Sequence, residues 1–257
     1  LPEVVAVRIG GPIALLAIAI IVPLSSSPST IRLFSIAAIY GIVAVSLVVL
    51  SGWAGQVSLG QYAFVGLGAI LVGDLMNHYN LDLFVCLVAA GAAGALLAVL
   101  VGLPALRMQG LFLAVTTLAL AVTVDAFFLN PVNFNSLIPN TIQRPVLWKR
   151  FDLTNERDLY YLCLAVLVLT VVFVHGLRRA RAGRVMVATR ENPRAAAAMA
   201  VPTTRVKLVG FVTSGAIAGV AGGLHATILQ SVGFGTYQPS ESLLVFSMLI
   251  IGGADSI

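Results

Sequence analysis

Charged side chains are scarce in this chain of 257 residues. Asp, Glu, Lys and Arg together make up only 10% of it, whereas 59% of the residues are hydrophobic. A soluble domain has about a quarter of its residues charged, because it must cover its surface with polar groups. The composition therefore excludes a disordered chain, argues against a soluble enzyme and predicts an integral membrane protein.

Cysteine, histidine and the common catalytic motifs are also rare or missing. Cys86 and Cys163 lie inside apolar runs, where they resemble small buried hydrophobic residues more than a disulfide or a metal site. His78, His175 and His225 are far apart in the sequence, which argues against a metal site. Neither a phosphate-binding Gly-x-x-x-x-Gly-Lys-Ser/Thr motif nor a Gly-x-Ser-x-Gly motif occurs. We therefore expect a non-catalytic chain that holds no cofactor or metal, does not hydrolyse ATP itself and binds no nucleic acid.

Long apolar runs fill most of the sequence. A helix needs about 20 apolar residues to cross a bilayer. We predict an all-α fold, with residues 1–257 forming a single transmembrane domain: a polytopic helix bundle with about eight hydrophobic segments, one of them short or broken. The segments are Ile9–Leu24, Ile31–Leu50, Tyr62–Met76, Leu83–Leu103, Leu111–Leu129, Leu159–Leu177, Leu208–Leu229 and Leu243–Ile257.

Basic residues give this bundle an orientation. Residues 178–207 carry eight of the 15 Lys and Arg residues but a single acid, Glu191. The positive-inside rule places this loop in the cytoplasm, and alternating crossings then place Arg8 and Arg107 on the same side. The stretch Asn130–Asp158 falls on the outside. The count predicts a cytoplasmic N-terminus.

A polar, glycine-rich stretch separates the second and third apolar runs. Residues 51–61 contain Gln56, Ser58 and Gln61 but no charge. Irregular backbone at membrane depth is tolerated where protein or a watery cavity satisfies it, and a broken helix offers backbone amides to a carboxylate. One interpretation is a translocation-path element with these three side chains near the substrate. The other is an ordinary cytoplasmic turn.

The basic loop contains the signals of a short helix. Asn192 can cap it, Pro193 suits its first turn, an alanine run follows, and Pro202 ends it. Such a helix fits docking into a partner's groove. The alternative is a solvated loop that merely satisfies the positive-inside rule.

A few polar residues lie within the apolar runs. Thr116 and Thr117 occupy the middle of a run and could line a pore, although threonine often bonds to the backbone of its own helix, which is the favoured interpretation. We expect Asp74, Asp125 and Glu241 to reach the membrane interface rather than form a buried site.

Four stretches carry a resemblance to a known family. Gly52–Ala69 is similar to a Gly-x-Ala-Gly-Gln-x-Ser-Leu-Gly segment, and Leu106–Leu118 to an Arg-x-x-Gly-x-x-x-Ala-x-x-Thr-Leu segment; Gly183–Lys207 and Ser242–Gly253 match a coupling loop and a last block. In this order they resemble the permease subunits of branched-chain amino acid ABC importers, of the LivM and LivH type.

The resemblance implies a location and a set of partners. It implies a multi-pass protein of the bacterial inner membrane, embedded in lipid, that receives solute from an extracytoplasmic binding protein. A second permease subunit, identical or different, would complete the path, and separate or fused ATPases would bind ATP and Mg²⁺. The resemblance makes Glu191–Ala200 the helix that docks into the ATPase. The residues assigned to this coupling are Arg190, Glu191, Asn192, Arg194, Ala195, Ala196 and Ala200.

The sequence departs from the family at two places and leaves the substrate open. Ala200 stands where the family commonly has Gly, and after Ala254–Ile257 family members continue, so we expect a longer natural chain. Leucine, isoleucine and valine are the expected substrates, with urea, short amides or other amino acids as the alternative. A secondary transporter or channel would need an intramembrane ion pair or a filter ring, and the run centres are almost free of charge.

Overall fold

The computed structural model describes residues 16–24, 26–79, 81–105, 110–134, 141–142, 146–147, 151–152, 155–233 and 235–253. Arg8, Arg107 and Ala254–Ile257 lie outside these ranges, so the expectations placed on them stay predictions.

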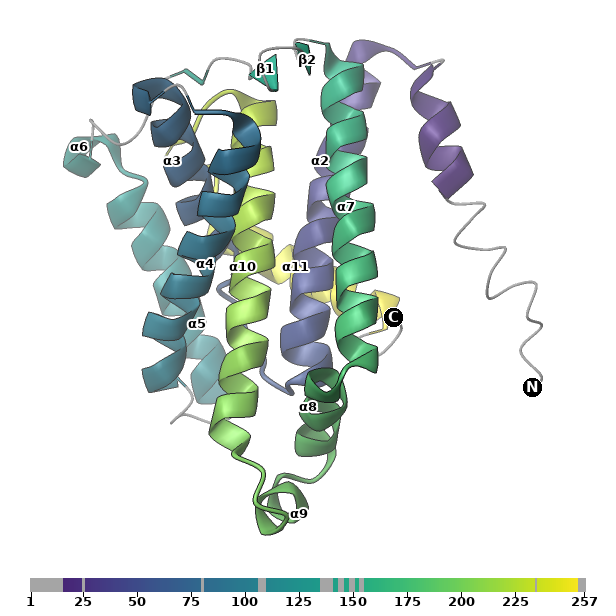
Figure 1. Ribbon diagram of the computed structural model, residues 1–257. Helices are drawn as coiled ribbons and strands as arrows, with labels where there is room; N and C mark the ends of the chain where they lie inside the picture. The colour runs from purple at the N-terminus through teal and green to yellow at the C-terminus, as the bar shows by residue number, and fades with distance from the viewer. Residues whose placement is uncertain are drawn as a thin grey trace.

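The regular secondary structure of the described residues is helical apart from one short strand pair, which confirms the predicted all-α class in its coarse form (Figure 1). A helix covers residues 16–24. The other helices are α2 (Pro28–Leu47), η1 (Val48–Trp53), α3 (Gln61–Tyr79), α4 (Leu83–Ala105), α5 (Leu111–Thr123), η2 (Val124–Phe128), α6 (Pro131–Phe134), α7 (Glu156–Arg179), α8 (Arg181–Glu191), α9 (Pro193–Ala198), α10 (Thr203–Leu229) and α11 (Pro239–Gly252). Strands β1 (Val146–Leu147) and β2 (Phe151–Asp152) pair antiparallel.

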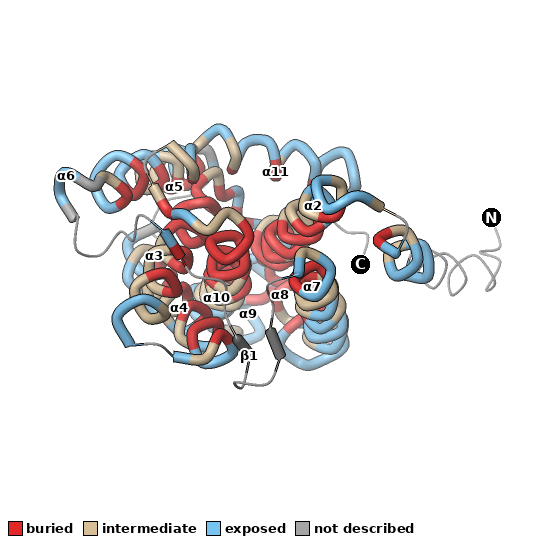
Figure 2. The backbone as a smooth tube through the Cα atoms, turned by 90° about the horizontal axis from the view of Figure 1, so that it is seen from above, coloured by how far each residue is buried: buried red, intermediate tan, exposed pale blue. Residues whose placement is uncertain are grey.

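Helix α10 is the centre of the bundle. Seen from above, it lies between α3 and α4 on one side and α2 and α7 on the other, while α5 and α11 run along one edge (Figure 2). The strand pair marks one end of the bundle, called here the hairpin end, and α8 and α9 mark the opposite end, called the α9 end (Figure 1).

Small residues allow α10 to take this central place. A methyl group on Gly215 would lie 2.7 Å from the Ala98 Cβ and 2.7 Å from the Gly94 carbonyl oxygen of α4. A methyl group on Gly222 would overlap the backbone carbonyl of Val65 in α3. Backbones that approach this closely associate through van der Waals packing, which is how membrane helices pack where lipid removes the hydrophobic driving force.

Local signals fix several helix ends. Ser27 caps α2 by accepting a hydrogen bond from the Thr30 amide, and Pro28 occupies the first turn. Helix α2 then continues without interruption into the π-helical turn η1. At the hairpin end, α10 stops at Gln230, whose left-handed backbone ends the helix. The Gln230 carbonyl accepts a bond from the Ile142 amide at 2.9 Å, which ties this end to the long α6–α7 connection.

The outside of the bundle is apolar, as a lipid-facing surface must be. Phe112 is 76% exposed and Leu169 is 70% exposed, and many other large apolar side chains are exposed with them. Among the described residues, four helices are long and apolar enough to cross a membrane: Pro28–Trp53, Leu83–Pro104, Glu156–Arg179 and Thr203–Leu229. The chain is therefore a membrane protein, whereas eight crossings stay a prediction.

Helix α11 does not run along the bundle as the last apolar run suggested. It crosses behind α2 at middle height, and seen from above it extends from α5 toward α2 (Figures 1 and 2). Residues before it return from the hairpin end into the bundle, where the Gly235 amide donates to the Asp125 carboxylate at 3.1 Å. Its first turn therefore begins inside the bundle.

Candidate functional site

The break between η1 and α3 is the most polar part of the bundle interior. Gly55 adopts a positive φ of 66°, which turns the chain away from η1, and residues 54–60 are not helical. The Gln56 amide still donates to the Leu50 carbonyl at 3.1 Å, and the Ser51 hydroxyl donates to the Gln56 carbonyl at 2.9 Å. The irregular backbone is thus satisfied by protein, as membrane depth requires.

Gln61 connects three helices at this break. Its side-chain Nε2 donates to the Ser46 hydroxyl of α2 at 2.7 Å and to the Ser214 hydroxyl of α10 at 2.9 Å. All three side chains are fully buried. We call Gln61, Ser46 and Ser214 the Gln61 cluster.

Three buried polar atoms around the break have no hydrogen-bond partner. They are Gln61 Oε1, Gln56 Oε1 and Trp53 Nε1, all among the described residues. A buried polar atom left unpaired costs about 1–3 kcal/mol, so natural folds rarely keep one without a reason. The break therefore stores free energy that another arrangement of the helices, or a bound polar molecule, could recover.

Side-chain hydroxyl groups accept hydrogen bonds from backbone amides at the start of α3. The Leu59 amide donates to Thr117 Oγ1 of α5 at 3.0 Å, and the Tyr62 amide donates to Ser242 Oγ of α11 at 3.0 Å. Ser58 Oγ lies 3.4 Å from the Gly60 amide, the longest of these bonds. In this conformation the Leu59 and Tyr62 amides are therefore not available to a substrate carboxylate.

The proposed path residues differ in their placement. Gln56, Ser58, Gln61 and Thr117 are buried together around the break, between 0% and 3% exposed, so solvent does not reach them in this conformation. Thr116 points elsewhere on α5 and donates to the Phe112 carbonyl at 2.8 Å, which is the backbone bond that threonine often makes. The structure thus brings four of the five residues together.

Glu241 does not lie where we expected it. Its carboxylate accepts a bond from the Tyr40 hydroxyl at 2.5 Å, and Tyr40 is the thirteenth of the 26 residues in the span Pro28–Trp53. The prediction that Glu241 reaches the interface is wrong, because the chain between α10 and α11 turns back into the bundle. Asp125, unlike the half-buried Glu241, is buried, at 7% exposure. Asp74 pairs with His78 on the last turns of α3.

Sequence reasoning missed Ser46, Ser214, Ser242 and Tyr40. Each lies within or at the start of an apolar run, and serines in such runs commonly bond to their own helix, as Ser35 does to the Ile31 carbonyl at 3.0 Å. Ser242 follows Glu241 directly, so an acid and a hydroxyl at the start of the last apolar run were the available signal.

At the α9 end, the basic loop folds as two helices. Asn192 caps α9 as predicted, since its side chain accepts a bond from the Ala195 amide at 3.0 Å. Helix α9 covers Pro193–Ala198 and protrudes from the bundle (Figure 1); Ala196 is buried, whereas Glu191, Arg194, Ala195 and Ala200 are exposed.

Arg190 links this loop to the break. Its guanidinium donates to the Gly52 carbonyl at the end of η1, and a methyl group on Gly55 would lie 2.9 Å from its Cγ. On the same side, the Arg178 guanidinium lies 5.8 Å from the ring centroid of Trp53, within the range of a cation–π contact. The last turn of α8 therefore rests directly on the segment that precedes Gln56.

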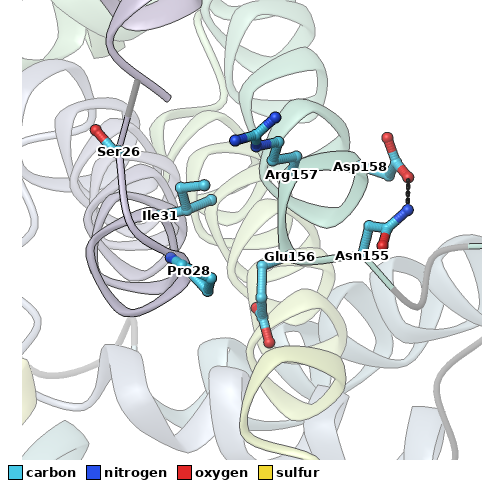
Figure 3. A pocket seen from close by; sticks show the side chains of 7 residues that line it. All are labelled: Ser26, Pro28, Ile31, Asn155, Glu156, Arg157 and Asp158. Carbon is cyan, nitrogen blue, oxygen red and sulfur yellow. Dashed lines mark hydrogen bonds between the residues drawn. The ribbon is translucent and has the colours of Figure 1, made fainter. Parts of the chain in front are cut away.

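The opposite end carries a polar pocket between the first turns of α2 and α7 (Figure 3). It has a volume of about 500 Å³ and includes Glu156, Arg157 and Asp158, with Asp158 bonded to Asn155 at 3.2 Å. This pocket therefore places charges of both signs at the hairpin end.

Comparison with known proteins identifies relatives over nearly the whole chain. A family model described as "Branched-chain amino acid transport system / permease component" matches residues 29–257. The high-affinity branched-chain amino acid transport system permease proteins LivM of Salmonella typhimurium and Escherichia coli are each 30% identical to it, over 95% of this chain and 63% of the relative. The chain thus spans less than two thirds of these curated relatives. No solved structure matches it.

Proposed function

The chain belongs to the branched-chain amino acid transport permease family, and from this premise we propose that it is the membrane-spanning permease subunit of an ABC importer for leucine, isoleucine and valine. The match over residues 29–257 carries the proposal. The polar break sealed inside an apolar bundle supports it, because a translocation path needs polar groups at membrane depth.

The partners in this proposal follow from the two ends of the bundle. The α9 end, with its basic residues, faces the bacterial cytoplasm and two ATPase subunits or domains, which bind ATP and Mg²⁺. The hairpin end faces outward and receives solute from a binding protein, for which the charged pocket at Glu156, Arg157 and Asp158 is the candidate contact. A second permease subunit completes the path.

The proposed path runs along the break. Gln56 and Gln61 would contact the substrate once the bundle opens, since each has an unpaired side-chain oxygen. Ser58 and Thr117 hold the backbone before α3 and would rearrange with it. In this proposal the described conformation corresponds to a closed path, because these side chains are buried from solvent.

The proposed coupling element is α9 with its neighbours. Its protruding end carries exposed Arg194 and Met199, the latter 81% exposed. An exposed apolar side chain among basic residues suits the groove of a partner protein. Movement of α9 would reach the path through α8, because Arg190 holds the Gly52 carbonyl.

Purification of the whole complex from membranes tests this function. We expect ATPase subunits to co-purify with the wild type and the complex to take up labelled leucine with ATP. Glu191→Arg and Met199→Asp should release the ATPases. Arg157→Glu, at the opposite end, is the matched control and should keep them.

Two results would change the proposal. If ATPases co-purify but urea or short amides are transported in place of leucine, the substrate belongs to the alternative class of this family. If no ATPase co-purifies with the wild type, the importer proposal is wrong and a secondary transporter takes its place.

A further inference from the structure

Glu241 places a carboxylate in the middle of the membrane-spanning bundle. Its partner Tyr40 is halfway along the span Pro28–Trp53, and the ring of Tyr62 lies 6.1 Å from that of Tyr40. Glu241 is half-buried as a residue. An ionisable group at this depth is costly, which makes it a candidate functional site.

The surroundings of this carboxylate suit an ammonium group. A carboxylate has two oxygens that can each accept more than one hydrogen bond, and Tyr40 uses Oε2. The ring of Tyr40 lies 6.1 Å from that of Tyr62, and tyrosine rings can attract a cation through their faces. An ammonium group placed here would gain a charge-assisted hydrogen bond in a region where water is scarce.

An apolar groove leads away from the same tyrosine. It runs between α2 and α11, has a volume of about 580 Å³ and includes Tyr40 in its wall. Its other walls are aliphatic side chains and a methionine: Leu33, Ile36, Ala37, Ala44, Leu244 and Met248. The groove is open on its outer side, where Leu33, Leu244 and Met248 are 41% to 65% exposed, and its aliphatic walls favour a branched aliphatic group.

A hydrogen bond connects the neighbourhood of Glu241 to the break already described. Ser242, next to Glu241, bonds the Tyr62 amide, and Tyr62 follows Gln61. Glu241 and Gln61 are therefore each next in sequence to a residue of the Ser242–Tyr62 bond at the start of α3.

We propose that Glu241 binds the ammonium group of the transported amino acid, while the groove between α2 and α11 accepts its aliphatic side chain. This rests on the proposed function and narrows its substrate class. An ionised Glu241 attracts a zwitterion with a free ammonium group, whereas urea and short amides offer no positive charge.

A structural role for Glu241 is the competing explanation, since the Tyr40 bond also holds α11 against α2. Glu241→Gln separates the two roles, because the amide oxygen can still accept the Tyr40 hydroxyl bond while the charge is lost. Glu241→Asp keeps the charge. Tyr40→Phe keeps the carboxylate and removes the bond.

The experiment uses the full complex in vesicles with saturating leucine-loaded binding protein. Uptake of labelled leucine and ATP hydrolysis are measured together. For Glu241→Gln we expect unchanged assembly, ATP hydrolysis within about twofold of wild type, and about tenfold less leucine moved per ATP, the order of loss for a charge-assisted bond. Glu241→Asp should recover part of the loss, and Tyr40→Phe should stay within about threefold of wild type.

Competition by analogues identifies the recognised group. In the complex without binding protein, 3-methylbutan-1-amine, which has the ammonium group, should displace labelled leucine from the wild type but not from Glu241→Gln. 4-Methylpentanoate, which has only the carboxylate, should displace it less than one tenth as well.

Each outcome decides one of the two ideas. Three results would overturn the role of Glu241: wild-type leucine transport per ATP in Glu241→Gln, equal losses in Tyr40→Phe and Glu241→Gln, or stronger competition by the carboxylate analogue. Each of them would leave the importer function standing. A wild-type complex that transports none of leucine, isoleucine and valine would instead overturn the proposed function.

Discussion

At the scale of single residues, the most informative side chains are buried amides with incomplete hydrogen bonding. Gln56 and Gln61 each keep an unpaired side-chain oxygen inside the bundle. An acceptor that lacks a partner in one arrangement of the helices gains by changing to another, because each unpaired group costs about 1–3 kcal/mol. We therefore expect the bundle to rearrange at this break rather than along its apolar helix contacts.

A residue-scale prediction concerns the strained backbone after α9. Ala200 has a positive φ of 58°, a region that costs a residue with a Cβ about 1–2 kcal/mol. Ala200→Gly should therefore raise the free energy of unfolding by about 0.5–1 kcal/mol after the entropy of glycine is subtracted. Thermal unfolding of the purified complex measures this as a higher melting temperature.

Ala197→Gly is the matched control, because Ala197 lies inside α9 with helical backbone. It should lower the stability by about 0.5–1 kcal/mol. Equal changes of the same sign in both variants would contradict the strain at Ala200. This strain also accounts for the glycine that the family resemblance leads one to expect at this position.

The residues of the break could be predicted from the sequence only in part. Gln56 and Gln61 stood out because two amides without any charge interrupt an apolar pattern. Their partners did not, since Ser214 is 153 residues from Gln61, and Glu241 is 201 residues from Tyr40. Which residues come into contact over such sequence separations depends on how α10 and α11 pack, and no local sequence pattern specifies that packing.

At the scale of elements, α3, α4 and α10 form one tightly packed group. Gly68 of α3 and Gly94 of α4 both face α10 at positions where a methyl group would overlap its backbone. Contacts of this kind leave no room for small adjustments, because backbone atoms cannot move aside as a side chain does when it changes rotamer. We expect these three helices to move as one body during transport.

A pair of glycine substitutions tests this packing. Gly222→Ala places a methyl group against the Val65 carbonyl, so it should lower the stability by about 1–3 kcal/mol. In Gly176→Ala the new methyl group would meet no described atom within 4 Å, and the higher helix propensity of alanine should leave the stability equal or raise it by up to about 1 kcal/mol.

The melting temperatures of the two variants in detergent give the comparison. A Gly222→Ala protein as stable as Gly176→Ala would mean that α3 and α10 are further apart than described.

Helix positions were better predicted than helix directions. The expected run Ile31–Leu50 became the span Pro28–Trp53, because hydropathy fixes the apolar middle and the Ser27 cap fixes the start. The last run became α11, which crosses the bundle instead of running along it. Hydropathy measures burial in lipid or protein alike, so it does not indicate the angle of a helix.

At the scale of the whole molecule, Arg190 connects the two regions to which we assign functions. The α9 end, proposed to contact the ATPases, and the break, proposed to contact substrate, are connected through this side chain and the carbonyl of Gly52. A contact from charged side chain to backbone carbonyl transmits displacement in both directions, as coupling between two sites requires.

Arg190→Met should separate ATP hydrolysis from transport. Methionine keeps an aliphatic chain against Gly55 but loses the bond to Gly52, a charged hydrogen bond worth about 1.5–3 kcal/mol. We expect the ATPases to remain bound and ATP hydrolysis to continue, while leucine moved per ATP falls about tenfold.

Arg184→Met is the control, since Arg184 lies on the same helix with an exposed side chain and loses the same charge. It should behave as wild type in uptake per ATP. Equal losses in both variants would assign the effect to the charge of the loop and not to the Gly52 contact.

The burial of both thiols has a practical consequence for spectroscopy. Cys86 and Cys163 are each 0% exposed, so a maleimide has little access to either in the folded chain. Pairs of cysteines introduced at exposed positions, such as Arg194 on α9 and Tyr79 at the end of α3, can then carry fluorophores or spin labels without removal of the two native cysteines. Distances between such labels would follow the opening of the bundle directly in an otherwise native molecule.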